Sequence, residues 1–168
     1  RWGSSRVTRR LNLPVSNEAA FIELSARRRL LGMHSMRATY QVLRETYFDT
    51  SDRALRNRGI TLRWRSEARG REVLELTVRD GVSLQGVAEE TSIETPVVGG
   101  GLYATLAGNS EIASRVKEIT EVDSLRPLAA VDIDRETRDL RPRPMGRATH
   151  RIAFDEIVAH APGASRAF

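Results

Sequence analysis

The chain lacks cysteine entirely, and only 5% of its 168 residues are aromatic. The absence of cysteine excludes disulfides and metal sites built from thiolates. No run of about 18 apolar residues occurs, so no transmembrane helix is predicted. The first residues do not form the pattern of a secretory signal peptide. These absences favour a cytoplasmic protein without membrane contact. The length of 168 residues is sufficient for a single hydrophobic core.

Lysine is nearly absent as well, because all but one of the 27 Lys and Arg residues are Arg, and the net charge is +5. A bias of composition would spread these arginines evenly along the chain. A binding site would instead align them on the faces of particular strands. Since a planar guanidinium group donates paired hydrogen bonds to phosphate oxygens, aligned arginines would predict a phosphate ligand.

The length predicts one domain over residues 1–168. The chain begins with Arg1 rather than Met, which is consistent with a domain trimmed or cut from a longer protein at either end. Residues 161–168 are expected to form a flexible tail.

The segment 45–65 has the clearest local pattern. Asp49 opens a turn capped by side chains, and Gly59 is suited to end a short helical turn because glycine readily adopts a positive φ. The residues that follow alternate as in a strand, with Ile60, Leu62 and Trp64 on one face and Thr61, Arg63 and Arg65 on the other. The two arginines are therefore about 7 Å apart along the strand and suited to hold an oxyanion.

Other segments alternate in the same way, and about seven strands are expected, joined mostly by hairpins, with helices near 16–31, 102–106 and 110–119. Several strands have one charged and one apolar face. In a β-sandwich the charged faces would meet solvent. In a barrel with a polar lumen the charged faces would point inward and the apolar faces would pack outward under helices. The pattern alone leaves both arrangements open.

Six short motifs spread over most of the chain resemble the CYTH superfamily, the triphosphate tunnel metalloenzymes. They are Tyr47–Thr50, Leu55–Gly59, Leu62–Arg65, Leu76–Arg79, Leu125–Leu128 and Ile152–Asp155. The resemblance implies an α+β fold in which an antiparallel β-barrel with flanking helices surrounds a hydrophilic tunnel.

The resemblance also implies a basic tunnel lining. Its predicted substrate-binding residues are Arg63, Arg65, Arg79 and Arg135, with Arg138 and Arg10 as further candidates. Like charges that converge repel each other unless an anion neutralises them. The expected ligand is a triphosphate or polyphosphate, either inorganic or carried by a nucleotide or thiamine. No catalytic residue is assigned.

A divalent cation, Mg²⁺ or Mn²⁺, is the cofactor that the resemblance implies, and such ions prefer oxygen ligands. Glu90 and Glu94 share one side of a predicted strand, Glu75 shares a face with Arg79, and Asp155 matches an aspartate of the family's late strand. These four carboxylates are the predicted metal ligands.

The chain departs from the family at its first strand, where the signature Glu-x-Glu-x-Lys is replaced by Arg6, Thr8 and Arg10. A late Glu-rich strand is also missing. If enough carboxylates remain, a metal-positioned water would hydrolyse the terminal phosphate. If they do not, the domain would bind polyphosphate and hydrolyse it poorly.

Two alternatives come from other functional classes. The excess of arginine permits nucleic-acid binding, but Trp2 and Trp64 are too isolated to form a base-stacking platform, so this partner is not favoured. The second alternative is a protein-interaction domain of a larger protein. The sequence does not predict an oligomeric state.

Overall fold

The computed structural model describes residues 6–10, 15, 17–67, 70–82, 88–97 and 99–160, and for residues 6–10, 80–82 and 88–89 the backbone alone. The strands are β1 (Arg6–Arg10), β2 (Arg29–Leu30), β3 (Met33–Ser35), β4 (Thr39–Asp49), β5 (Ile60–Glu67), β6 (Glu72–Val82), β7 (Ala88–Pro96), β8 (Arg126–Arg141) and β9 (His150–His160). The α-helices are α1 (Glu18–Ala26), α2 (Gly101–Ala107) and α3 (Glu111–Lys117), and short 3₁₀ helices span Arg56–Arg58 and Val122–Ser124.

The chain divides into two compact units. The first contains residues 1–12, 43–132 and 158–168, and the second contains residues 13–42 and 133–157. The strand order of the sheet is β1-β7-β6-β5-β4-β8-β3-β2, with β9 paired to β8. The first six strands of this order belong to the first unit in whole or in part, and the pairs within it from β4 to β7 are antiparallel.

The antiparallel α+β architecture is therefore confirmed, but the closed barrel is only an approximation. Among the strands that the structure describes, the hydrogen-bonded order has two ends, β1 and β2. A barrel closes only when its two edge strands pair with each other.

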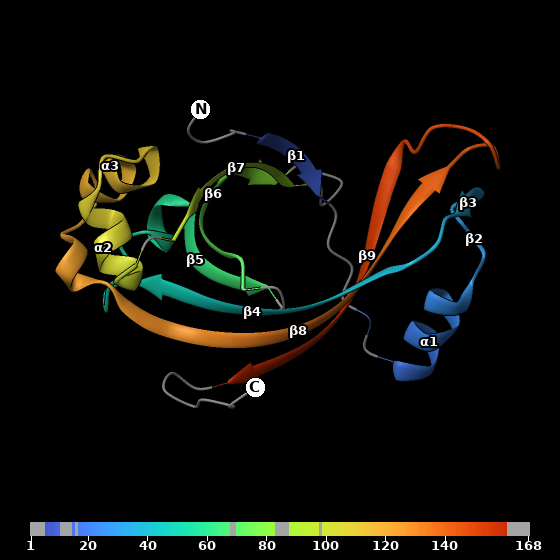
Figure 1. Cartoon of the computed structure of the whole chain (residues 1–168), viewed down its shortest axis with the longest axis horizontal. Helices are drawn as coiled ribbons and strands as arrows, with labels where there is room; N and C mark the ends of the chain where they lie inside the picture. Colours follow the sequence, from blue (N-terminus) through green and yellow to red (C-terminus); the bar gives the residue numbers. More distant parts are fainter. Residues whose placement is uncertain are drawn as a thin grey trace. The chain divides into compact units, whose positions relative to one another are not determined.

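The core of the first unit lies between the sheet and two helices. Leu62 of β5, Leu76 of β6 and Ile93 of β7 are buried against residues of α2 and α3, among them Leu106 and Val116. Figure 1 shows both helices against one side of the curved strands β5, β6 and β7. The apolar strand faces thus pack under helices, as in the barrel arrangement, and the opposite faces are left to polar residues.

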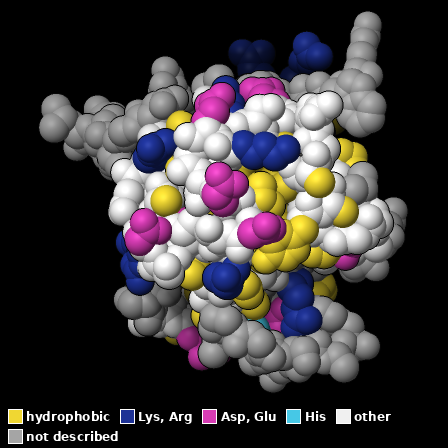
Figure 2. All heavy atoms as spheres, turned by 90° about the vertical axis from the view of Figure 1, so that its left-hand side faces the viewer, with side chains coloured by type: hydrophobic (Ala, Val, Ile, Leu, Met, Phe, Trp, Pro, Cys, Tyr) yellow, Lys and Arg dark blue, Asp and Glu magenta, His cyan; other side chains and the backbone are white. Residues whose placement is uncertain are grey.

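Among the residues that the structure describes, the outer side of these helices carries no large region of one charge sign. Single acidic and basic side chains are scattered among hydrophobic and uncharged ones on the side that Figure 2 shows. An extended basic patch is the usual electrostatic footprint of a nucleic-acid-binding surface. The described residues on this side do not form one.

Asp49 fixes the turn between β4 and β5. Its buried carboxylate accepts hydrogen bonds from the backbone N–H groups of Thr50 (2.8 Å), Leu55 (2.9 Å) and Arg56 (3.1 Å). Gly59 then ends the 3₁₀ turn with φ of 70°, a conformation that favours glycine. These contacts set the start of β5 and hence which of its side chains face the helices.

The second unit has its own small core. Leu30, Leu140 and Phe154 are buried there, and the ring of Phe21 in α1 meets that of Phe154 edge to face at 5.9 Å. The predicted helix over 16–31 is wrong in its extent, since α1 ends at Ala26. Gly32 lies in the turn between β2 and β3 with φ of 76°.

Replacing Asp49 by alanine is expected to destabilise the first unit by about 2–3 kcal/mol, because three backbone N–H donors, two of them buried, lose a charged acceptor. The free energy of unfolding, measured with urea, checks this. Asp139→Ala is the matched control, since Asp139 pairs with the exposed Arg151 and its loss should cost less than about 1 kcal/mol. Equal losses for the two variants would contradict the role of Asp49.

Of the residues that the structure describes, none belongs to a helix long and apolar enough to cross a lipid bilayer.

Candidate functional site

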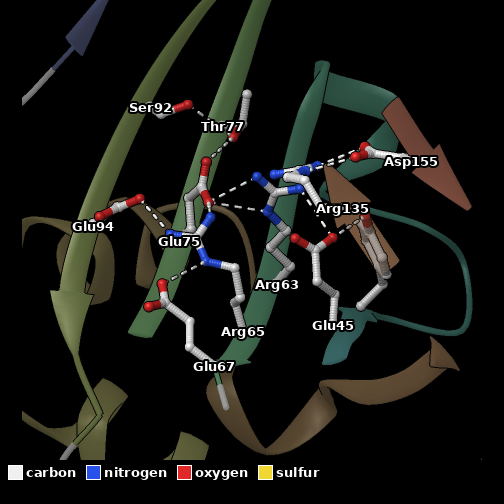
Figure 3. A network of polar contacts seen from close by, with 11 residues as sticks. Glu45, Arg63, Arg65, Glu67, Glu75, Thr77, Ser92, Glu94, Arg135 and Asp155 are labelled. Atoms are coloured by element: carbon white, nitrogen blue, oxygen red, sulfur yellow. Dashed lines mark hydrogen bonds and ion pairs between the residues drawn. The ribbon is translucent and has the colours of Figure 1, made fainter. Parts of the chain in front are cut away.

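The register of four strands brings charged residues together on the polar face of the first unit. Tyr47 of β4 lies opposite Arg63 of β5, Arg63 lies opposite Glu75 of β6, and Glu75 lies opposite Glu94 of β7. Directly opposite residues of antiparallel strands point to the same side of a sheet. One row across the sheet therefore holds a tyrosine, an arginine and two glutamates. Figure 3 labels the arginine and both glutamates.

Arg63 joins the carboxylates of two neighbouring strands. Its Nε and Nη2 donate to Oε2 of Glu75 at 3.1 and 2.8 Å, and its Nη1 donates to Oε2 of Glu45 at 3.0 Å. The Tyr47 hydroxyl donates to the same Glu45 oxygen at 2.7 Å. Glu45 is 1% exposed and Glu75 is 3% exposed, so this guanidinium neutralises charge that water does not reach.

Arg65 continues the network toward β7. Its Nη1 donates to Oε2 of Glu75 at 2.9 Å, and its Nη2 donates to Oε1 of Glu94 at 2.7 Å. Oε2 of Glu75 thus accepts three N–H groups from two arginines. Figure 3 shows Arg63 and Arg65 on either side of this carboxylate. We call Glu45, Arg63, Glu75, Arg65 and Glu94 the charge ladder.

Two members of the charge ladder, Glu75 and Arg63, have pKa values shifted in the directions that pairing requires. Burial raises the pKa of Glu75, but the charges and hydrogen bonds of Arg63 and Arg65 outweigh burial and hold that pKa below its ordinary value. Burial lowers the pKa of Arg63, but Glu45 and Glu75 outweigh it, so the pKa is raised. Burial, and then the Glu45 carboxylate, raise the pKa of the Tyr47 hydroxyl. Glu75 and Arg63 are thus stabilised in their ionised forms, and the Tyr47 hydroxyl in its neutral form.

The remaining predicted site residues pair in the same manner. Arg79 of β6 donates to Oε1 of the buried Glu90 of β7 at 3.1 Å. In the second unit, Arg135 makes two hydrogen bonds of 2.7 Å to the two carboxylate oxygens of Asp155.

Arg138, also in the second unit, makes contacts that support the fold of that unit. It donates to Glu136 and to the backbone carbonyls of Ser25 and Arg27, at the end of α1. Its guanidinium also lies 5.7 Å from the ring centre of Phe154. These contacts hold α1 against the strands of the second unit. Arg10 is described by its backbone only and lies opposite Ala88 in the register of β1 and β7.

A comparison with protein families identifies the domain. The model of the CYTH domain matches residues 11–159. The chain belongs to the CYTH domain family. This match confirms the resemblance carried by the six sequence motifs, and it begins just after β1, the strand that lacks the glutamate signature.

Two solved structures resemble this chain at low sequence identity, and the first of them has a similar fold. A candidate adenylate cyclase from Bacillus halodurans is 14% identical, with a TM-score of 0.54 over 90% of this chain and 79% of that one. A candidate adenylyl cyclase from Hippeastrum, described as having a dominant triphosphatase activity, is 17% identical, with a TM-score of 0.47 over 99% of this chain and 93% of that one. No curated protein sequence matches this CYTH domain significantly.

The predicted metal ligands and the predicted phosphate ligands were separate sets in the sequence analysis. In the structure of this CYTH domain they are partners. Each of the predicted metal ligands binds an arginine that is itself a predicted phosphate ligand: Glu75 and Glu94 bind Arg65, Glu90 binds Arg79, and Asp155 binds Arg135. Carboxylates of the same chain therefore already neutralise these arginines, a pairing that the sequence analysis did not predict.

Glu45 and Tyr47 are the polar-face residues that sequence reasoning missed. Glu45 is fully buried, and its Oε1 accepts no hydrogen bond from the described residues. The two residues occupy alternate positions in β4, which was the available signal. That signal was weak because Arg44 and Thr46, the neighbours of Glu45, are polar too.

The described residues of this CYTH domain do not fit the divalent cation on which the family generally depends. No group of three or more His, Asp or Glu side chains in the described ranges is placed to hold a metal ion. Oε2 of Glu75 already accepts three guanidinium N–H groups, and Mg²⁺ requires oxygens at about 2.0–2.1 Å in octahedral geometry. Oε1 of Glu45 lacks a donor, but a single oxygen beside a guanidinium is not a cation site.

Arg63→Ala is expected to lower the free energy of unfolding by about 3 kcal/mol, because it leaves the buried Glu45 carboxylate without a charged partner and the buried Glu75 carboxylate with Arg65 alone. Chemical denaturation measures the change. In the control Arg115→Ala, an exposed pair with Glu111 is lost, and the cost should be at most about 0.5 kcal/mol. A change for Arg63→Ala no larger than the control would show that the charge ladder does not support the fold.

Acidification is expected to destabilise the protein partly through Glu75. A carboxylate whose folded-state pKa is depressed adds stability above its unfolded pKa of about 4.3, and this stability is lost as the pH falls further. Glu75→Gln removes this contribution, so its unfolding free energy should fall less steeply than that of the wild type below about pH 4.5. Urea unfolding across this range provides the test. Identical slopes would contradict the pairing of Glu75 in the folded state.

Proposed function

We propose that this CYTH domain binds a triphosphate or polyphosphate chain on the polar face of β4–β7, with Arg63, Arg65 and Arg79 as phosphate ligands. Membership of the CYTH family supports the ligand class, since CYTH domains act on triphosphate compounds. The cytoplasmic location, the single-domain organisation and the contributions of Arg135, Arg138 and Arg10 remain predictions attached to this proposal.

One observation carries the proposal. Three N–H groups from Arg63 and Arg65 converge on one anionic oxygen, Oε2 of Glu75, at 2.8–3.1 Å. Charge-assisted hydrogen bonds of this kind are how arginines hold phosphate oxygens. The carboxylate oxygen therefore marks a position where a phosphate oxygen would find the same donors.

A second feature points to an anion in the same region. Nε of Arg65 is buried and donates no hydrogen bond to the described residues. Oε1 of Glu67 lies 3.7 Å away, which is beyond hydrogen-bond distance. A buried donor without an acceptor costs free energy, and a phosphate oxygen would satisfy it.

The proposal does not include a hydrolytic step. Hydrolysis with Mg²⁺ or Mn²⁺ needs carboxylates that can leave their partners for a metal, and all four predicted ligands are paired with arginine. The residues of the polar face would bind and orient a phosphate chain through guanidinium groups. Of the two mechanisms that the sequence left open, binding with poor hydrolysis suits this geometry better.

Binding of inorganic tripolyphosphate, followed by isothermal titration calorimetry, tests the proposal. Arg65→Ala is expected to weaken binding about tenfold or more, because losing a charge-assisted contact costs about 1.5–3 kcal/mol. Arg115→Ala removes the same charge from the surface of α3 and should leave the affinity unchanged. If the wild type binds no tripolyphosphate, or if both variants bind as it does, the proposal is wrong.

A further inference from the structure

The charge ladder contains more negative than positive side chains. Glu45, Glu75 and Glu94 face only Arg63 and Arg65 within it. Glu67, 3.7 Å from Arg65, adds a further carboxylate at one end, and the exposed Arg71 lies 3.8 Å from Glu94. When a phosphate chain binds, it would compete with these carboxylates for the same guanidinium groups.

We infer that Glu75 and Glu94 of this chain are built-in counter-anions of the phosphate-binding arginines rather than metal ligands, so that phosphate binding needs no divalent cation and is opposed by these two carboxylates. This inference rests on the proposed function. In a metal-dependent family member, carboxylates that hold the cation would favour phosphate binding. In this chain, Glu75 and Glu94 would oppose it.

Geometry places Glu75 in direct competition with a phosphate. Its Oε2 takes three of the N–H groups of Arg63 and Arg65, and its Oε1 lies 3.3 Å from the Thr77 hydroxyl. A phosphate oxygen can gain those three donors only if the carboxylate moves away from them. The free energy of breaking these bonds is then subtracted from the free energy of phosphate binding.

Glu94 holds the neighbouring donor in the same way, at 2.7 Å from Nη2 of Arg65. Its side chain is 39% exposed, against 4% for Glu75, so it can turn toward water at little cost when an anion approaches. Displacement of both carboxylates frees donors spread over two arginines. A chain of several phosphates could occupy these donors together, whereas a single phosphate would replace only one carboxylate with another small anion.

The direction in which one substitution changes the affinity for tripolyphosphate distinguishes the two roles. If Glu75 is a counter-anion, Glu75→Gln removes a competing charge and should tighten tripolyphosphate binding about tenfold, equivalent to about 1.4 kcal/mol. If Glu75 is a metal ligand, the same substitution should weaken binding measured with Mg²⁺. Titrations of inorganic tripolyphosphate in EDTA and in excess Mg²⁺ or Mn²⁺ compare the two.

Because Glu75 is buried, Glu75→Gln is first checked for a cooperative thermal transition, and Glu94→Gln provides a second variant at a more exposed position. Glu94→Gln should also tighten binding in EDTA, by a smaller factor. Glu111→Gln is the control, since it removes an arginine-paired carboxylate from α3 and alters net charge equally. Its affinity should equal that of the wild type.

Each outcome has a distinct meaning. Wild-type binding in EDTA that divalent cations do not strengthen, together with tighter binding by Glu75→Gln or Glu94→Gln, supports the inference. Binding that appears only with Mg²⁺ or Mn²⁺, or that both variants weaken, overturns the inference and leaves the proposed function standing. No binding by any variant in either condition defeats the proposed function itself.

Discussion

The polar face of this CYTH domain depends on one interaction, the contact of Glu75 with both Arg63 and Arg65. A carboxylate that is 3% exposed could not remain ionised in this position without its guanidinium partners, and the arginines could not lie side by side without a shared anion. The four strands β4, β5, β6 and β7 each contribute a member of the charge ladder. Pairing of the strands and pairing of the charges therefore support each other.

The apolar face of the same strands fixes the positions of the charge-ladder side chains on the polar face. Leu62, Leu76 and Ile93 are buried against α2 and α3, which fixes the direction in which the alternate residues point. Asp49 sets the start of β5 by accepting three backbone N–H groups. A slip of one residue in β5 would move Arg63 and Arg65 to the apolar side. The core thus positions the site.

Sequence periodicity predicted much of this arrangement. The alternation in 60–65 gave the shared face of Arg63 and Arg65, and the positive φ of Gly59 followed from its place after a short helical turn. The family resemblance supplied the antiparallel sheet with its helices. The end of α1 at Ala26 could not be predicted, because the residues after it remain compatible with a helix by propensity and are taken into β2 by tertiary pairing.

The pairing of acidic with basic residues was beyond the sequence because it depends on which strands are neighbours. Arg63 and Glu45 are far apart in any local pattern, and only the order β4-β5-β6 brings them to 3.0 Å. Without these carboxylates, the converging positive charges of the arginines would require an external anion. With them, the same arginines form a neutralised site into which an anion must enter by exchange.

The central claim is that a phosphate oxygen and the Glu75 carboxylate use the same guanidinium donors. A crystal structure of the protein grown with inorganic tripolyphosphate in the absence of divalent cations tests this most directly. The account predicts a phosphate oxygen within hydrogen-bond distance of Arg63 and Arg65, with the Glu75 carboxylate moved away from both. A phosphate chain bound elsewhere, or bound while Glu75 keeps its three hydrogen bonds, would contradict the account.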